Sequence, residues 1–191
     1  DMAGSTDFGL IMEIFKSLGV QDSIGERDKF FQLYLSKLKV NLSDPKFDGQ
    51  LLPGVVKTLN KLSEPNERYD IFIGLLTGNL KEGAKIKVEH YGIEKFFTFG
   101  AYGCDHFDRN ELGPIALDRA HNEYGILFDP QETIVIGDTP KDINCAKAFG
   151  ARSFAVATGS FSIDQLMNYS PDYVLNDLDD WEQASRVLFS K

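Results

Sequence analysis

From residue 70 onward the chain alternates between two kinds of segment, and this alternation limits the folds that it can adopt. Short runs rich in β-branched residues, such as residues 133–137, are typical of buried strands. Longer stretches with apolar residues at helical spacing follow them, such as residues 141–149, which end before Gly150. Strands separated by helices indicate a parallel sheet with right-handed crossovers. We therefore predict an α/β fold with a Rossmann-like parallel core.

The first part of the chain has a different pattern. Residues 8–18 and 26–39 carry apolar side chains at helical spacing, with Asp7 as the expected N-cap, and a polar stretch with turn residues follows. We therefore expect two domains, a helical one at 1–48 and the α/β core at 49–191. The remaining strands are predicted at 70–76, 95–99, 152–157 and 172–175, and the remaining helices at 53–62, 80–90, 111–124, 162–168 and 179–189.

The composition limits the kinds of molecule that the chain is expected to bind. The 191 residues carry a net charge of −9, which argues against nucleic acid, because neutralising its phosphates requires clustered Lys and Arg. No apolar run reaches the length of a membrane span. The two cysteines, Cys104 and Cys145, are far apart and form no Cys-x-x-Cys pair. We expect a cytoplasmic protein with free thiols, monomeric or homodimeric, that binds neither nucleic acid nor membranes.

Two carboxylates follow the apolar run at 133–137. Asp138 stands at the end of the predicted strand, and Asp142 lies in the first turn of the helix that Pro140 opens. Open α/β sheets bind ligands at the carboxyl ends of their strands, and two carboxylates there suit a hard cation such as Mg²⁺. The spacing also suits a simple helix start, with Asp138 as the cap and Asp142 near the positive end. Spacing alone leaves both interpretations open.

Two more clusters follow predicted strand ends. Thr77 offers a hydroxyl, and Gly78 and Asn79 offer N–H groups at a helix start, an arrangement that binds anions but is also an ordinary capping turn. Arg109 is either the positive charge for a phosphate or a solvated surface charge. Because the carboxyl ends of parallel strands lie on one edge of a sheet, we expect these clusters to converge with Asp138.

Taken in order, the clusters resemble the motifs of the haloacid-dehalogenase-like (HAD) hydrolase superfamily, in its phosphoglycolate-phosphatase-like branch with a helical cap. Leu-Leu-Thr-Gly-Asn at 75–79 is similar to the second motif, and Gly-Asp-Thr-Pro-Lys-Asp-Ile at 137–143 is similar to the fourth. Residues 155–159 and 172–175 also resemble this branch, as does Gly-Ser-Thr-Asp at 4–7, which is similar to a segment of such caps. The resemblance covers essentially the whole chain.

This resemblance implies a Mg²⁺-dependent phosphatase that acts on a small phosphorylated metabolite, with phosphoglycolate as one candidate. Thr77 would bind the transferring phosphoryl group with help from Gly78 and Asn79. Asp138 would ligate Mg²⁺, and Asp142 would ligate or orient it.

The third motif of the family usually presents a Lys, and the matching segment at 108–114 has none. Arg109 takes that place by position and charge, ahead of Lys81 and Lys141.

The family's first motif, Asp-x-Asp-Gly-Thr, is not found in these residues. Because that motif supplies the aspartate nucleophile on the first central strand, we expect this strand and the catalytic Asp to lie upstream of residue 1. Two alternatives stay open. One is a non-catalytic HAD-like domain that binds a phosphometabolite or a protein. The other is a different chemistry of the superfamily, such as that of a phosphomutase; dehalogenation is disfavoured because it needs no Mg²⁺.

Overall fold

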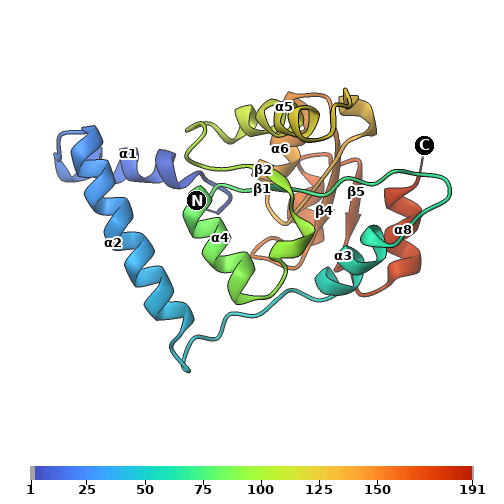
Figure 1. Ribbon diagram of the computed structural model, residues 1–191, viewed down its shortest axis with the longest axis horizontal. Helices are drawn as coiled ribbons and strands as arrows, with labels where there is room; N and C mark the ends of the chain where they lie inside the picture. The colour runs from blue at the N-terminus through green and yellow to red at the C-terminus, as the bar shows by residue number, and fades with distance from the viewer. Residues whose placement is uncertain (1–2, 191) are drawn as a thin grey trace.

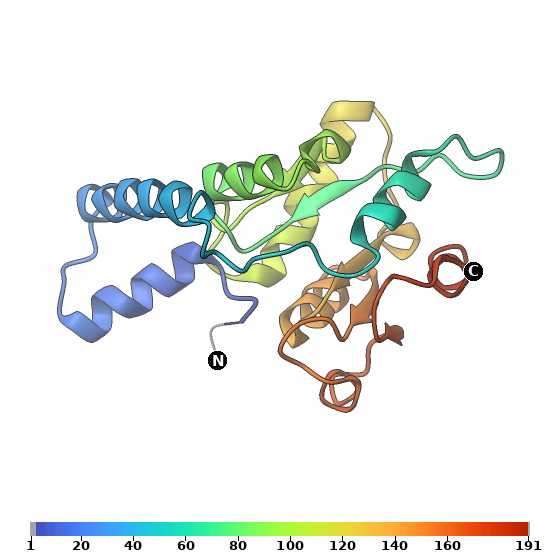
Figure 2. The ribbon, with the colours of Figure 1, turned by 90° about the horizontal axis from the view of Figure 1, so that it is seen from below.

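The computed structural model describes residues 3–190 (Figures 1 and 2). Asp1, Met2 and Lys191, at the outer limits of the two predicted domains, lie outside the described residues. The predicted α/β class is confirmed, since every strand pairing in the described part of the chain is parallel. The strands are β1 (Gly74–Leu76), β2 (Phe99–Ala101), β3 (Ile134–Gly137), β4 (Arg152–Val156) and β5 (Tyr173–Leu175).

Within residues 3–190 the strands form two sheets. β1 pairs with β2, with Gly74 opposite Phe99. In the second sheet β4 lies between β3 and β5, with Phe154 opposite both Ile136 and Tyr173. β1 and β3 are therefore both edge strands, and an edge strand presents a row of unpaired N–H and C=O groups.

Side chains along β4 alternate between the two faces of the second sheet, and helices pack on both faces. Phe154 and Val156 on one face pack with Leu178, against α3 (Val55–Ser63) and α8 (Trp181–Leu188). Ala155 points to the opposite face and packs with Ile143 and Leu166, which come from α6 (Pro140–Ala148) and α7 (Ile163–Met167). α5 (Leu112–Tyr124) lies against β1 and β2. The core thus has three layers around β4.

Two helices precede the sheets and extend to one side of the molecule (Figure 1): α1 (Asp7–Leu18) and α2 (Ile24–Leu42). The Thr6 side chain accepts a hydrogen bond from the Gly9 N–H, so Thr6 is the N-cap of α1 and the prediction of Asp7 was wrong. α2 packs on α4 (Lys81–His90), where the Gly83 backbone lies against Tyr34. The predicted boundary near residue 48 falls in the extended segment between α2 and α3, and the division into two domains stays a prediction.

The structure differs from the prediction at residues 95–99. A 3-10 helix, η1 (Glu94–Phe96), occupies the first part of this segment, and β2 begins only at Phe99. The aromatic residues favour a strand locally, but the register with β1 starts at the pair Gly74 and Phe99, and tertiary pairing overrides β-propensity. Two further 3-10 turns are η2 (Arg109–Glu111) and η3 (Pro130–Glu132). None of the described helices has both the length and the apolar character that a membrane span requires.

The packing around β4 predicts a stability effect. Phe154 is 1% exposed, so Phe154→Ala should lower the free energy of unfolding by about 3 to 5 kcal/mol, because it leaves a cavity in the core. Leu127 is 84% exposed, and Leu127→Ala should change the free energy by less than about 0.5 kcal/mol. Urea unfolding followed by circular dichroism measures both. Equal effects of the two substitutions would contradict the assignment of the core.

Candidate active site

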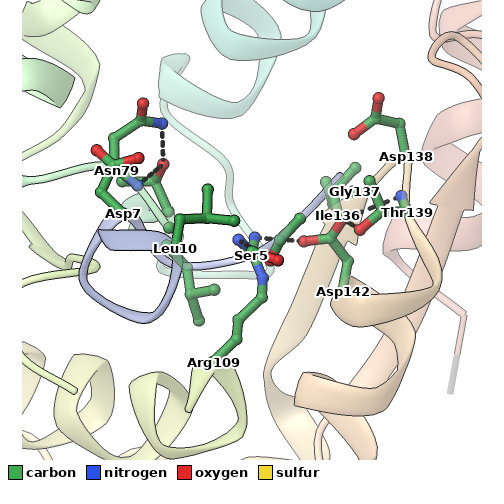
Figure 3. Close-up of a pocket in the computed structure, with 14 residues that line it drawn as sticks. Ser5, Asp7, Leu10, Asn79, Arg109, Ile136, Gly137, Asp138, Thr139 and Asp142 are labelled. Carbon is green, nitrogen blue, oxygen red and sulfur yellow. Dashed lines mark hydrogen bonds and ion pairs between the residues drawn. The ribbon is translucent and has the colours of Figure 1, made fainter. Parts of the chain in front are cut away.

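A cavity of about 410 Å³ opens between the carboxyl ends of β1 and β3 (Figure 3). Leu76 borders it from β1 and Ile136 from β3, the two edge strands. The clusters that were predicted to converge do so here, because all six predicted site residues line this cavity: Thr77, Gly78, Asn79, Arg109, Asp138 and Asp142. The parallel strands bring together segments that are 60 residues apart in the chain.

The Thr77 loop follows β1 directly. Thr77 Oγ1 accepts two hydrogen bonds, from the Asn79 N–H at 3.2 Å and from Asn79 Nδ2 at 2.7 Å. Asn79 therefore directs its backbone and amide donors at Thr77 and not at the cavity. The Gly78 N–H has no hydrogen-bond acceptor among residues 3–190, so it is free to donate to a ligand.

Arg109, in the 3-10 turn η2, reaches across the cavity to α6. Its Nη2 donates to Asp142 Oδ1 at 2.5 Å, and its Nη1 donates to the Gly4 carbonyl at 3.3 Å (Figure 3). The Arg109 side chain is 12% exposed, so the solvated surface charge that the sequence left open is excluded. Of the other two cations considered, Lys141 bonds Ser5 Oγ, and Lys81 lies over the Tyr102 ring.

Asp142 takes the helix-start role that the sequence left open and also pairs with Arg109, while its role as a metal ligand stays a prediction. Its Oδ2 accepts from the Thr139 N–H at 3.0 Å and from the Thr139 hydroxyl at 2.7 Å, which completes a capping box at the start of α6. Its Oδ1 binds Arg109 in the cavity wall. The N-cap of α6 is Thr139, so the interpretation of Asp138 as the cap was wrong.

Asp138 faces the cavity from the end of β3. Burial raises the pKa of its carboxyl above the usual value near 3.8, and the negative charge of Asp142 raises it further. The hydrogen bond from its own backbone N–H and the positive charge of Arg109 lower this pKa, but by less. Gly159 contributes to this burial, since a Cβ atom there would lie 1.9 Å from Asp138 Oδ2. A carboxylate confined beside a second one is a favourable position for a cation.

The residues around the start of α1 also line the cavity, a position that was not predicted from the sequence. The Asp7 N–H donates to the Gly78 carbonyl at 2.6 Å, and Asp7 Oδ2 accepts from the Leu80 N–H at 2.8 Å. A Cβ atom on Gly78 would lie only 2.0 Å from the Ser5 carbonyl oxygen, so the close approach of the two segments requires glycine. The one signal in the sequence was the Gly-Ser-Thr-Asp segment itself.

The donor set fits Mg²⁺ in part. This ion is usually held by one or two carboxylates, with water and phosphate oxygens completing six positions. Asp138 and Asp142 could supply these two carboxylates. A cluster of three or more His, Cys, Asp or Glu suited to a metal does not occur within residues 3–190. The metal site therefore stays a prediction.

Comparisons with known proteins indicate the same superfamily as the order of these clusters in the sequence. Residues 110–181 match the model of the HAD-hydrolase-like family. The chain is 27% identical over 127 residues to the pyrophosphatase PpaX of Halalkalibacterium halodurans and 27% identical over 130 residues to the phosphoglycolate phosphatase of Vibrio cholerae. These alignments cover 66% and 68% of this chain, and 56% and 54% of the relatives. The chain thus spans about half the length of the curated relatives that it matches.

The chain is thus similar to HAD-like hydrolases, most directly over residues 110–181. Solved structures agree on the fold of this HAD-like chain. A β-phosphoglucomutase of Clostridium difficile superposes with a TM-score of 0.70 at 18% identity, over 97% of this chain and 78% of that one. A hydrolase of Pseudomonas syringae superposes with a TM-score of 0.69 at 17% identity, over 99% and 81%. The predicted resemblance to this superfamily is confirmed.

The environment of Asp138 in this HAD-like chain predicts a dependence of stability on pH. Because the pKa is raised on folding, the folded state binds this proton more tightly, and stability falls as the pH rises from about 3.8 through the raised pKa. Asn cannot ionise. Without divalent cations, Asp138→Asn should therefore unfold at a higher temperature than the wild type at pH 7, and the difference should shrink as the pH falls toward 4.

Thermal unfolding from pH 4 to pH 8 measures this difference. Asp28→Asn is the matched control, because Asp28 is exposed on α2, and its unfolding temperature should stay close to that of the wild type throughout. A lower unfolding temperature for Asp138→Asn than for the wild type at pH 7 would contradict the prediction.

Proposed function

We propose that the cavity binds the phosphoryl group of a small phosphorylated metabolite and forms part of the active site of a Mg²⁺-dependent phosphatase. The observation that carries this proposal is the meeting of Thr77, Arg109 and Asp138 in one cavity. The first two offer hydrogen-bond donors to an anion, and the third offers a carboxylate to a cation. Hydrolysis of a phosphate ester needs both kinds of group.

The donors of the cavity support an anionic ligand. Within residues 3–190 the Gly78 N–H has no acceptor, and Thr77 Oγ1 already accepts two hydrogen bonds, which leaves its own hydrogen to donate. Arg109 Nε is buried without a hydrogen-bond partner among residues 3–190. A buried N–H without an acceptor costs free energy, and a phosphoryl oxygen would supply that acceptor.

The charges of the cavity support a cation beside the anion. Three carboxylates line it, those of Asp7, Asp138 and Asp142, against the one guanidinium of Arg109. A phosphate alone would meet net repulsion there. Asp138 and Asp142 would hold Mg²⁺, which when bound would offset the negative charge on the phosphoryl oxygens. Arg109 would take the place of the family Lys.

None of the three carboxylates of the cavity is free to act as a nucleophile, because two are hydrogen-bonded and the third, Asp138, is the proposed metal ligand. Asp7 accepts from the Leu80 N–H, and Asp142 is held by Arg109 and Thr139. We therefore propose that the nucleophilic aspartate lies on a strand outside these residues, upstream of residue 1, that pairs with the free edges of β1 and β3. The exposure of Ile136 on the edge strand β3, 37%, supports this position.

The position of the N-terminal helices beside the cavity supports the proposal of a small substrate. Leu10 of α1 lines the cavity together with Ser5, so residues 1–48 would act as a cap that limits the size of the ligand. The relatives are named a phosphoglycolate phosphatase and a pyrophosphatase, both of which act on compact phosphorylated compounds. A substrate of this class fits a cavity of about 410 Å³.

The first test is binding of inorganic phosphate to the 191-residue chain, measured by calorimetry with and without Mg²⁺. We expect binding that needs Mg²⁺ and that Thr77→Val weakens about tenfold, because one donor to an anion is lost. Ser36→Ala, an exposed hydroxyl on α2, is the control and should leave the affinity unchanged. Absence of phosphate binding in the presence of Mg²⁺ would overturn the proposal.

The second test is turnover by a chain that also carries the proposed upstream strand. Such a chain should release phosphate from p-nitrophenyl phosphate with Mg²⁺, and Asp138→Asn or Arg109→Ala should lower kcat about a hundredfold, since each removes charge stabilisation of the transition state. Activity that survives EDTA would exclude the metal role. Phosphate binding without any turnover would favour the non-catalytic binding domain.

A further inference from the structure

A polar connection runs from the last turn of α4 to the Thr77 hydroxyl. Lys87 Nζ donates to Asn79 Oδ1 at 2.5 Å, and Asn79 Nδ2 donates to Thr77 Oγ1 at 2.7 Å. Lys87 is partly buried and does not line the cavity, whereas Asn79 and Thr77 do. Lys87 belongs to no motif of the sequence analysis, so its contact with Asn79 calls for an explanation of its own.

The first step concerns the orientation of the Asn79 amide. An asparagine side chain has one end that accepts and one end that donates, while a lysine ammonium can only donate. Lys87 therefore requires the oxygen of Asn79 on its side. The NH₂ group of Asn79 must then face Thr77, as the structure has it.

The second step concerns the direction of the Thr77 hydroxyl. A hydroxyl oxygen has two lone pairs, and in Thr77 both are occupied, one by the Asn79 N–H and one by Asn79 Nδ2. Its hydrogen is left to donate, and the cavity is the side on which Thr77 meets a ligand. A phosphoryl oxygen accepts hydrogen bonds, so this arrangement suits it. With the amide reversed, Asn79 would present its oxygen, and the hydroxyl would donate to Asn79 instead.

Asp7 helps to keep Lys87 charged in this partly buried position. Burial lowers the pKa of Lys87, and the negative charge of Asp7 raises it. Burial raises the pKa of Asp7. The hydrogen bond from the Leu80 N–H and the charge of Lys87 lower this pKa, but by less. Burial and the charge of Asp7 also raise the pKa of Tyr34 to about 12.

We propose that Lys87 is a positioning residue for phosphate binding: it holds the Asn79 amide in the one orientation that leaves the Thr77 hydroxyl as a donor to a phosphoryl oxygen. This inference rests on the proposed function of the cavity and adds a residue that touches neither substrate nor metal. Lys87 acts through Asn79 and Thr77, and this route separates it from a cation that attracts phosphate by its charge alone.

The test uses calorimetry with inorganic phosphate and Mg²⁺ on the 191-residue chain. Lys87→Met keeps the aliphatic chain and removes the donor, and it should weaken phosphate binding about tenfold, the loss expected when one hydrogen bond to an anion is misdirected. Lys85→Met is the matched control on the same helix, because the Lys85 side chain is 72% exposed. It should leave the affinity unchanged.

A double-mutant cycle with Thr77→Val decides whether Lys87 acts through the hydroxyl. If it does, Lys87→Met should cause no further loss in the Thr77→Val background. A further loss of about tenfold there would overturn the inference, since it would mean that Lys87 acts by charge or by general destabilisation. Asn79→Ala breaks the same connection at its middle. It should reproduce the loss of Lys87→Met, and it serves as the test if Lys87→Met fails to fold by circular dichroism.

A measurement without ligand separates this inference from the proposed function. The Asn79 side-chain NH₂ signals in a ¹H–¹⁵N spectrum, assigned by their loss in Asn79→Ala, should shift in Lys87→Met and not in Lys85→Met. If the wild type binds no phosphate, the proposed function fails and the inference fails with it. If the wild type binds phosphate but Lys87→Met changes neither these signals nor the affinity, the inference fails alone.

Discussion

The arrangement of the site depends on the carboxylate of Asp142. One of its oxygens closes the capping box that starts α6, and the other holds Arg109, so a single side chain fixes the end of β3, the start of α6 and the turn η2 relative to one another. The Cys145 thiol adds to this by donating to the Arg109 carbonyl from the next turn of α6. Asp142 is 6% exposed, and a carboxylate at this depth is stable only when it is paired and hydrogen-bonded, as it is here.

The same arrangement makes the cavity a place of electrostatic strain. Asp138 stands beside Asp142 while Arg109 is paired with Asp142, and the pKa of Asp138 is raised first by burial and then by the negative charge of Asp142. At such a site the requirements of stability and function conflict, because the carboxylate that would bind a cation destabilises the fold when the cation is absent. The free edges of β1 and β3, which border the same cavity, are a second feature that costs stability and that a paired strand would remove.

Much of this structure could be predicted from local patterns, and the rest depended on contacts between distant segments. The β-branched run before Asp138 and the helical spacing after it are local, and so is the tendency of clusters at the ends of parallel strands to converge. The cap interpretation of Asp138 and the surface-charge interpretation of Arg109 could not be excluded locally, because the Thr139 cap and the buried pair with Asp142 are what exclude them. Residues 95–99 carry a strand-like composition that register with β1 overrides.

Lys87 was missed, and Asp7 was predicted only as a helix cap, for a related reason. Only the packing of the first turn of α1 against the loop after β1 brings these two charges together. That contact also joins α1 to the proposed phosphate site. Thr6 donates to the Phe107 carbonyl at 2.6 Å while Asp7 bonds the loop that carries Thr77, so the start of α1 is tied both to the segment before Arg109 and to the Thr77 loop. A rotation of α1 about this point would stretch those hydrogen bonds, so a ligand that shifted α1 would also shift the donors of the proposed phosphate site.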